Sequence, residues 1–257
     1  MLTMKGRTVF ITGASAGIGK ACAEAFASAG ASLLLAARRV DRLGELAAEL
    51  DAKHGTRCHC IELDVRRRAR VEDAIGTLPA PWKEIDVLVN NAGLGRGMDK
   101  LQEGSPEEWE EMIDTNVKGL LYVTRAVVPG MVARGRGHVI NIGSLAGREL
   151  YPGGNVYCAS KFAVKALTRG LKMDLLGTPV RVSTVDPGMV ETEFSVVRFR
   201  GDKDRASSVY KGLKALTGED IADAVLWVAT RPLHVDVTEM VVLPTAQASA
   251  TLNYREP

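Results

Sequence analysis

The sequence predicts an α/β protein in which a parallel sheet is covered by helices on both faces. Two observations support this prediction. Short apolar runs rich in β-forming residues recur along the chain, and longer segments with helical periodicity separate them. The seven runs are residues 7–12, 32–37, 57–63, 85–90, 137–142, 180–185 and 239–243. No repeat, low-complexity tract or linker interrupts the alternation, so residues 1–257 are expected to form a single domain.

The composition favours a small molecule as the binding partner. The formal net charge is only +2, from 33 Lys and Arg against 31 Asp and Glu, so no global field would attract nucleic acid or an anionic membrane. The first 15 residues lack the apolar region of a signal peptide, and no later stretch approaches a membrane span. The four cysteines show no disulfide pattern. We therefore expect a cytoplasmic protein.

The first apolar run leads directly into a glycine-rich turn, "TGASAGIG" at residues 12–19, and residues 20–30 have the pattern of a helix. Glycines allow a tight turn and a close backbone approach. The exposed N–H groups at the start of the helix attract a pyrophosphate. The predicted dinucleotide contacts are Gly13, Ser15, Ala16, Gly17, Ile18 and Gly19.

The second run ends about 20 residues after these glycines, where an NAD-binding chain usually carries an acid for the ribose 2′-hydroxyl. Here the chain carries Arg38 and Arg39. Two guanidinium groups suit a 2′-phosphate, so we predict NADP as the cofactor. The alternative is that both arginines only solvate the end of the strand, while Asp41 caps the following helix.

The third and fourth runs end in polar turns. Asp64 and Val65 follow the third, and Asn90, Asn91 and Gly93 belong to the "NNAG" that ends the fourth. Ligands of open α/β sheets lie beyond the carboxyl ends of strands, so we expect these residues to contact adenine and ribose. Turn chemistry alone is the alternative, because Asn and Gly suit tight turns without any ligand.

Two other features of this region resemble binding motifs. Cys58, His59 and Cys60 alternate along an expected strand, which turns the sulfurs to one side and the imidazole to the other. Buried small side chains are therefore expected there, and no metal site is predicted. The basic run at residues 64–73 closes with Glu72 and Asp73, which favours the solvated first turn of a helix over a phosphate site.

The fifth run places Ser144 at the same edge, and residues 155–176 have the length and composition of a helix. Tyr157 and Lys161 are four positions apart on that helix and face one ligand, with Cβ atoms roughly 6 Å apart. Oxidation of an alcohol needs a base near the hydroxyl. Tyr157 can act as that base if its pKa falls from about 10 towards 7, and the ammonium of Lys161 has the required charge. Ser144 is expected to donate to the substrate oxygen, and Asn116 to order a water that links Lys161 to solvent.

Together these motifs resemble those of the classical short-chain dehydrogenase/reductase family over nearly the whole chain. The motifs are "TGASAGIG", "NNAG", Asn116, Ser144, "YCASK" and "DPGMVET". The resemblance implies a Rossmann-type, doubly wound sheet of seven strands, with Tyr157 as acid/base and Lys161 also bound to the nicotinamide ribose. It also implies cofactor contacts in the last motif, at Pro187, Gly188, Val190 and Thr192.

Other segments resemble a narrower group, the NADP-dependent 3-hydroxy acid dehydrogenases. They include "MIDTNVKGL", "GHVINIGSLAG" and "TEFSVVRFRGDKDRA". The resemblance implies hydride transfer to or from L-serine, allo-threonine, 3-hydroxypropionate or similar acids, in a homotetramer. A buried substrate carboxylate needs a partner, and the candidates are Arg148, Arg198 and Arg200, of which we favour Arg198. Residues 191–216 are expected to form a mobile insertion that covers the substrate.

Two other functions are compatible with the fold. One is a general NADPH-dependent carbonyl reductase that acts on ketones, polyols or ketoacyl groups. The other is a nucleotide sensor without turnover, against which the complete set of Ser144, Tyr157 and Lys161 argues, because a sensor needs no base.

Overall fold

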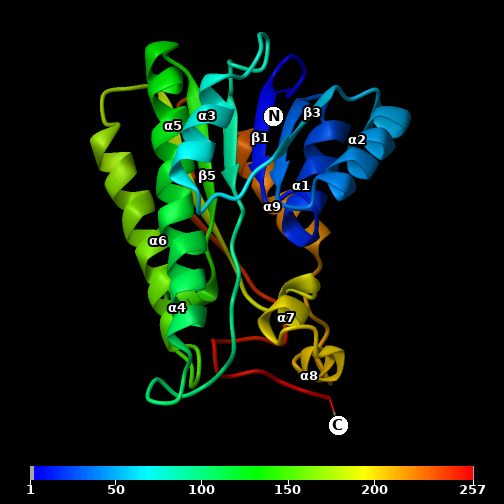
Figure 1. Cartoon of the computed structure of the whole chain (residues 1–257), viewed down its shortest axis with the longest axis vertical. Coiled ribbons are helices and arrows are strands. Elements are labelled where there is room, and N and C mark those ends of the chain that lie inside the picture. Colours follow the sequence, from blue (N-terminus) through cyan, green and yellow to red (C-terminus); the bar gives the residue numbers. More distant parts are fainter. Residues whose placement is uncertain (1–2, 257) are drawn as a thin grey trace.

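The computed structural model describes residues 3–256 and contains one seven-stranded sheet (Figure 1). All neighbouring strands are parallel, in the order β3-β2-β1-β4-β5-β6-β7. Each of the seven apolar runs forms one strand, so the expected parallel α/β fold is confirmed. The strands are β1 (Thr8–Thr12), β2 (Ser32–Ala37), β3 (Cys58–Glu62), β4 (Val87–Asn90), β5 (Gly137–Ile142), β6 (Val180–Pro187) and β7 (Glu239–Val242).

Helices cover both faces of this sheet. The long ones are α1 (Gly17–Ser28), α2 (Val40–His54), α3 (Arg68–Gly76), α5 (Leu120–Ala133), α6 (Asn155–Asp174) and α9 (Gly218–Ala229). Shorter ones are α4 (Pro106–Ile113), the π-helical turn η1 (Asp114–Gly119), the single turn η2 (Leu145–Gly147), α7 (Glu193–Arg198) and α8 (Lys203–Ser208). Figure 1 shows α1, α2 and α9 on one side of the sheet and α3, α5 and α6 on the other.

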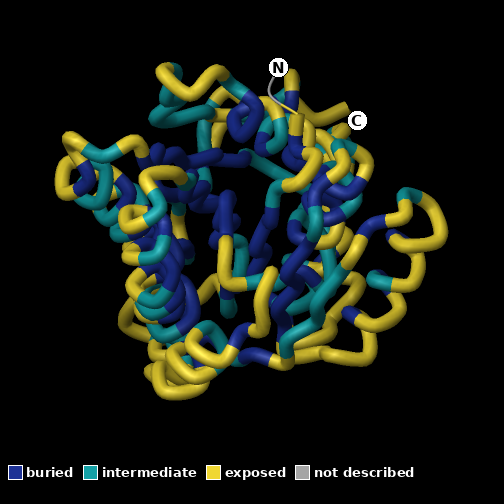
Figure 2. The backbone as a smooth tube through the Cα atoms, turned by 90° about the horizontal axis from the view of Figure 1, so that it is seen from above, coloured by how far each residue is buried: buried dark blue, intermediate teal, exposed yellow. Residues whose placement is uncertain are grey.

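Both faces of the sheet are buried. On β1, Val9 and Ile11 belong to the apolar cluster under α1, α2 and α9, whereas Phe10 belongs to the cluster under α3 and α5. All five residues of β1 are buried, which explains why the strand reads as a continuous apolar run. Figure 2 shows the buried backbone in the interior, with exposed loops around it.

The strand order creates a switch point beside β1. The chain places β2 and β3 on one side of β1 and then β4 to β7 on the other. At such a point the loops after β1 and β4 diverge and leave a crevice beyond the carboxyl ends of the strands. The polar and glycine-rich segments identified in the sequence all follow strands at this edge.

Buried polar side chains link the strands beyond the switch point to the helices behind them. The Nδ2 atom of Asn90 donates to Thr124 Oγ1 at 3.0 Å and to Asn141 Oδ1 at 2.9 Å. The Nδ2 atom of Asn141 donates to Thr168 Oγ1 on α6 at 2.9 Å. All four residues are buried. Because a buried polar group is costly unless it is paired, this chain fixes α5 and α6 against β4 and β5.

The segment between β6 and α9 departs from the sheet. It carries α7 and α8, which lie in Figure 1 beyond the carboxyl edge and beside the C-terminal tail. The tail contacts the turn after α8, with Arg255 Nη1 donating to Lys211 O at 2.5 Å and Glu256 N donating to Gly212 O at 2.7 Å. The segment between β6 and α9 therefore lies next to the crevice at the carboxyl edge of the sheet.

Across residues 3–256, none of the helices combines the length and the apolar character that crossing a membrane requires.

The buried polar chain predicts an effect on stability. Asn141→Leu removes the group that both accepts from Asn90 and donates to Thr168, so it should lower the free energy of unfolding by about 2–4 kcal/mol. Gln102→Leu, a change at an exposed amide, should stay within about 0.5 kcal/mol of the original chain. Urea unfolding of the three proteins measures both values. If Asn141→Leu were as stable as the original chain, the buried chain of polar side chains would contribute nothing to stability.

Candidate active site

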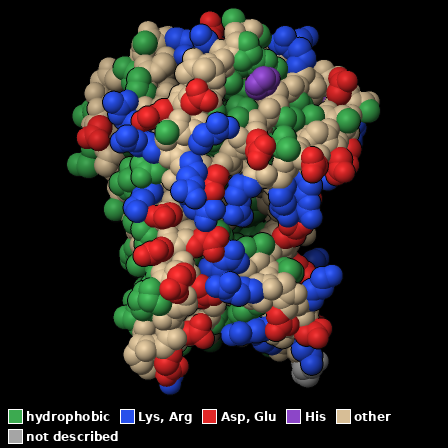
Figure 3. Space-filling model, in the orientation of Figure 1, with side chains coloured by type: hydrophobic (Ala, Val, Ile, Leu, Met, Phe, Trp, Pro, Cys, Tyr) green, Lys and Arg blue, Asp and Glu red, His purple; other side chains and the backbone are tan. Residues whose placement is uncertain are grey.

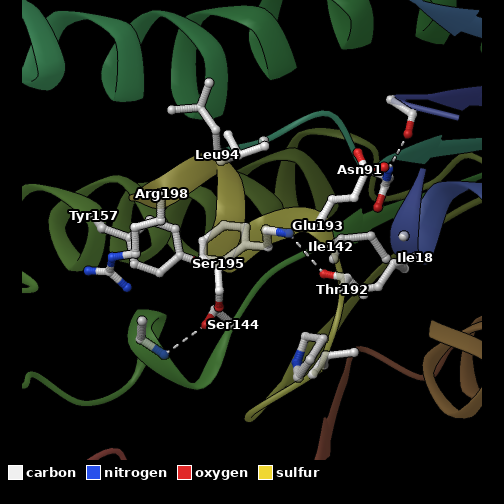
Figure 4. Close-up of a pocket in the computed structure, with 18 of the residues that line it drawn as sticks. Ile18, Asn91, Leu94, Ile142, Ser144, Tyr157, Thr192, Glu193, Ser195 and Arg198 are labelled. Carbon is white, nitrogen blue, oxygen red and sulfur yellow. Dashed lines mark hydrogen bonds between the residues drawn. The ribbon is translucent and has the colours of Figure 1, made fainter. Parts of the chain in front are cut away.

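A cavity of about 550 Å³ opens at the carboxyl edge of the sheet. The loops after β1 to β6 and helix α7 form its walls. Figure 4 shows Ser144 and Tyr157 on one side of it and Ile18 and Asn91 on the other. In Figure 3, basic side chains gather across the middle of the face shown. The site residues expected from the sequence that line the cavity are Gly13, Ser15, Ala16, Gly17, Ile18, Arg38, Arg39, Asp64, Val65, Asn91, Gly93, Ser144, Tyr157, Lys161, Pro187, Gly188, Val190, Thr192 and Arg198.

The glycine-rich loop has the geometry that a pyrophosphate needs. Gly13 has φ +66° and Gly17 has φ +53°, in the left-handed region that favours glycine. Asn91 Nδ2 donates to Thr12 O at 2.9 Å and to Gly13 O at 3.1 Å, which ties the loop to the end of β4. Helix α1 begins without a side-chain cap, so its first N–H groups remain available to a ligand.

Two residues assigned to the cofactor from the sequence lie outside the cavity lining. Gly19 does not line the cavity, because it packs behind the loop, where an added Cβ would lie 2.3 Å from Gly13 O. Asn90 also lies outside the lining, since its side chain points to Thr124 and Asn141 between the sheet and the helices. Of the two adjacent asparagines, only Asn91 borders the cavity.

The arginines after β2 lie at the cavity, and one of them has an acidic partner. Arg39 Nη1 pairs with Glu193 Oε2 at 2.8 Å, and Arg39 Nε donates to Ser15 Oγ at 3.3 Å. Arg42 Nη1 pairs with the other oxygen of Glu193 at 2.7 Å. Asp41 lies in the first turn of α2 but makes no side-chain cap, so the capping alternative is not observed. The guanidinium groups of Arg39 and Arg42 hold the pKa of Glu193 below its usual value.

The end of β3 brings a carboxylate to the same wall. Arg66 Nε binds both oxygens of Asp64, at 2.9 and 3.0 Å, and its guanidinium lowers the pKa of that carboxyl. Upstream, Cys58 and Cys60 are half-buried, and His59 stacks on Trp82 with ring centroids 5.6 Å apart. Within the described part of the chain, no group of three or more His, Cys, Asp or Glu side chains is arranged to hold a metal ion.

Tyr157, Lys161 and Ser144 converge on the far side of the cavity. Tyr157 and Lys161 both lie on α6 and are buried, and Lys161 Nζ donates to Ile142 O at 2.9 Å. Ser144 follows β5 after the single residue Gly143, accepts a hydrogen bond from Ala146 N at 3.1 Å, and approaches the Tyr157 hydroxyl closely enough to lower the pKa of that phenol. The residues expected to act on a hydroxyl group are therefore brought together.

The expected fall in the pKa of Tyr157 is not found. Burial raises the pKa of its phenol well above the ordinary value, and nearby Tyr151 adds to the rise, whereas the hydrogen bond from Ser144 and the charge of Arg198 oppose it. Lys161 is no close counter-charge, because its Nζ lies 6.0 Å from the centre of the Tyr157 ring. Burial lowers the pKa of Lys161 itself from 10.5 to about 8.

Asn116 lies in η1, outside the cavity lining, and its side chain is committed to the protein. Its Oδ1 accepts from Leu94 N at 2.8 Å, and its Nδ2 donates to Leu94 O at 2.8 Å and to Ser160 Oγ at 3.0 Å. Both amide hydrogens are thus used to hold the loop after β4 against α6. That Asn116 orders a water beside Lys161 stays a prediction.

The structure separates the three candidate arginines for a substrate carboxylate. Arg148 pairs with Asp186 at 2.7 Å and with Glu239, and Arg200 pairs with Glu108 at 2.8 Å. Neither of these two arginines lines the cavity. Arg198 does line it and forms no ion pair among the described residues.

The cavity is also lined by residues that were not identified as site residues from the sequence, among them Tyr151, Glu193 and Phe194. Tyr151 opens the "YPGGN" loop just before α6, and such a loop next to the Tyr157 helix was a usable cue. Phe194 packs with its ring 5.5 Å from that of Tyr157. Its contact joins elements far apart in the sequence, so no local pattern indicates it.

Comparisons with known proteins agree with this geometry. Residues 7–202 match the short chain dehydrogenase family. The chain is 50% identical over 246 residues to the NADP-dependent 3-hydroxy acid dehydrogenase YdfG of Salmonella typhi, covering 95% of this chain and 98% of that one. It is 44% identical to the NADP-dependent 3-hydroxy acid dehydrogenase of Schizosaccharomyces pombe, over 100% of this chain and 99% of the other. A structure of the closed form of serine dehydrogenase complexed with NADP+ superposes with a TM-score of 0.92 at 48% identity, covering 97% of this chain and 100% of that chain.

The buried ammonium predicts a pH-dependent stability. Because the pKa of Lys161 is about 8 in the fold and near 10.5 in the unfolded chain, the unfolded state binds more protons between these values, and stability rises with pH there. Below pH 8 the fold carries the full cost of the buried charge. Lys161→Met should therefore be more stable than the original chain at pH 7, by on the order of 1–3 kcal/mol after loss of the bond to Ile142 O.

The difference should shrink as the pH rises from 8 towards 10.5, as chemical unfolding at pH 7, 8.5 and 10 would show. Lys165→Met, one turn later on the same helix and only partly buried, serves as the control, and its difference from the original chain should not follow this trend. If the difference in the free energy of unfolding between Lys161→Met and the original chain stayed constant or widened as the pH rose, the lowered pKa of Lys161 would be contradicted.

Proposed function

The chain belongs to the short-chain dehydrogenase family, and from this premise we propose that it is an NADP-dependent oxidoreductase acting on a small 3-hydroxy acid. The proposed reaction transfers a hydride between the hydroxyl-bearing carbon of the acid and the nicotinamide. The expected substrates are L-serine, allo-threonine, 3-hydroxypropionate or the corresponding semialdehydes. The observation that carries the proposal is the convergence of Tyr157, Ser144 and Lys161 in the cavity that the glycine-rich loop also borders.

The site fits a nicotinamide dinucleotide, which when bound supplies or accepts the hydride. Tyr157 exchanges the proton of the substrate oxygen, and Ser144 holds that oxygen while its charge changes. Because burial raises the pKa of Tyr157, its phenol stays protonated at neutral pH. That form donates a proton to a carbonyl oxygen, so the described chain is poised for reduction. Oxidation needs the deprotonated phenol, which positive charge near the Tyr157 ring favours. Arg198 supplies part of this charge, because its Cζ lies 5.5 Å from the centre of that ring.

Further parts of the proposal concern the surroundings of this site. Residues 191–216 are proposed to cover the substrate, since Phe194 and Arg198 of α7 line the cavity. A homotetramer is proposed because large apolar side chains are exposed on the outer helices and around β7. They include Leu121, Phe162, Met173, Leu176, Trp227, Leu233 and Val241. A cytoplasmic location is proposed from the sequence.

The role of Tyr157 is tested by removing only its hydroxyl. Tyr157→Phe should lower kcat for L-serine or 3-hydroxypropionate with NADP by about 1,000-fold or more, because proton transfer and the bond to the substrate oxygen are both lost. Absorbance of the reduced nicotinamide follows the rate, and fluorescence titration should show NADPH binding retained. Absence of any rate with 3-hydroxy acids in the original chain, combined with turnover of ketones, would favour the general carbonyl reductase instead.

The cofactor preference is tested at the end of β2. Replacing Arg38 and Arg39 by Ala should weaken NADP binding by about 10–100-fold, because charge-assisted bonds to the 2′-phosphate are lost, and leave NAD binding within about threefold. Arg57→Ala is the matched control, since this exposed arginine immediately precedes β3, at the opposite end of the neighbouring strand. Calorimetric titration of the original chain and both variants with each cofactor gives the six dissociation constants. Equal weakening for NADP and NAD would refute the assignment.

A further inference from the structure

Arg198 is a buried cation without a counter-ion among residues 3–256. Only 9% of the residue is exposed. Its Nε donates to Gly97 O at 2.8 Å and its Nη1 donates to the Tyr151 hydroxyl at 2.9 Å, while Nη2 is buried with no hydrogen-bond partner. An unpaired donor on a buried charge is costly, so a fold that retains one at a cavity is expected to offer it to an anion.

The groups that hold Arg198 are neutral. A carbonyl oxygen and a phenol orient the guanidinium through hydrogen bonds but leave its charge uncompensated, in contrast to the carboxylates that neutralise Arg148 and Arg200. Burial raises the pKa of Tyr151, which keeps this hydroxyl un-ionised near neutral pH. The positive charge therefore remains available to a ligand in the cavity.

Close packing between the loop after β4 and the loop before α6 forms a corner that sets the position of this guanidinium. Gly97 N donates back to Arg198 O at 3.1 Å, so the side chain and backbone of Arg198 are both tied to the loop after β4. The Tyr151 ring lies against Gly154, where an added Cβ would be 2.3 Å from a ring carbon. Gly153 packs equally closely on Met98 O, also at 2.3 Å. The corner leaves Tyr151 little freedom to move, which pre-organises the guanidinium.

The free donor lies beside the reacting groups. The Arg198 Cζ atom is 5.5 Å from the centre of the Tyr157 ring and equally 5.5 Å from that of Tyr151. Figure 4 shows Arg198 next to Tyr157 and on the same side of the cavity as Ser144. A 3-hydroxy acid carries its carboxylate two carbons from the carbinol carbon, so an oxygen held at Tyr157 and Ser144 places the carboxylate within reach of this guanidinium.

We propose that Tyr151 is a positioning residue for substrate specificity, whose hydroxyl orients Arg198 so that the free Nη2 binds the carboxylate of the 3-hydroxy acid. The pair selects acids over neutral alcohols of the same shape. This inference rests on the proposed function and adds to it the residue that distinguishes an acid from an alcohol. Tyr151 itself touches neither the proton nor the hydride.

The kinetic test compares 3-hydroxypropionate with its neutral isostere 3-hydroxypropanamide on the NADP-loaded protein. Tyr151→Phe should raise KM for the acid about tenfold, and Arg198→Gln about 100-fold, because the first misorients the cation and the second removes it. KM for the amide should change less than about twofold in Tyr151→Phe. Tyr254→Phe, at an exposed tyrosine, is the silent control.

The double variant separates positioning from independent binding. If Tyr151 acts only through Arg198, adding Tyr151→Phe to Arg198→Gln should raise KM for the acid no further. If Tyr151→Phe lowers the thermal midpoint of unfolding, Arg198→Lys supplies a second test. This variant keeps the positive charge but loses the planar pair of guanidinium donors. Binding of the acid should therefore weaken, while the preference for the acid over the amide persists. Additive effects, or equal effects on acid and amide, would overturn the proposal.

A binding measurement distinguishes this inference from the proposed function. Calorimetric titration of the NADP complex with propionate, which has a carboxylate but no hydroxyl, should show binding that weakens in Tyr151→Phe and disappears in Arg198→Gln. That result without turnover of any 3-hydroxy acid would refute the proposed reaction and leave the carboxylate site standing. Propionate binding that is indifferent to both variants would refute the site.

Discussion

The geometry of the site depends on one buried ammonium. Lys161 is enclosed by the protein, and its Nζ is bound to the carbonyl of the last residue of β5, at 2.9 Å. A buried charge tolerates few positions, so this bond fixes α6 along the strand. The turn η2 also packs closely on α6, since a Cβ on Gly147 would lie 2.7 Å from Lys161 O. Tyr157 on α6 and Ser144 before η2 therefore belong to elements that this bond and this close contact hold together.

Charge is distributed along the cavity in a way that suits a long anionic ligand and a short one. Arg38 and Arg39 lie at one end, next to the glycine-rich loop, and Arg198 lies at the other, beside Tyr157. Surface pairing moderates the first group, because Glu193 binds Arg39. No comparable carboxylate reaches Arg198 within the described chain. The two basic regions therefore differ in character, because Arg38 and Arg39 are exposed to solvent, which screens their charge, whereas Arg198 is buried.

The fold and the location of the site follow from local patterns, because strand runs, glycine turns and helical spacing are properties of neighbouring residues. The choice between Asn90 and Asn91 does not, since it depends on which side of β4 each residue faces, and therefore on register. The choice of Arg198 over Arg148 depends on Asp186 and Glu239, which are distant in sequence. The raised pKa of Tyr157 arises from burial, which no motif reports.

The corner that holds Arg198 has a consequence for how such enzymes diversify. Arg198 comes from α7, Gly97 from the loop after β4, and Tyr151 from the loop before α6, whereas Tyr157 belongs to α6 and Ser144 to the turn after β5. Changes in these surface segments can replace a carboxylate site with an apolar one while the sheet edge stays intact. Substitutions in two loops and one short helix can therefore change the substrate of a descendant of this chain while the groups at the sheet edge stay in place.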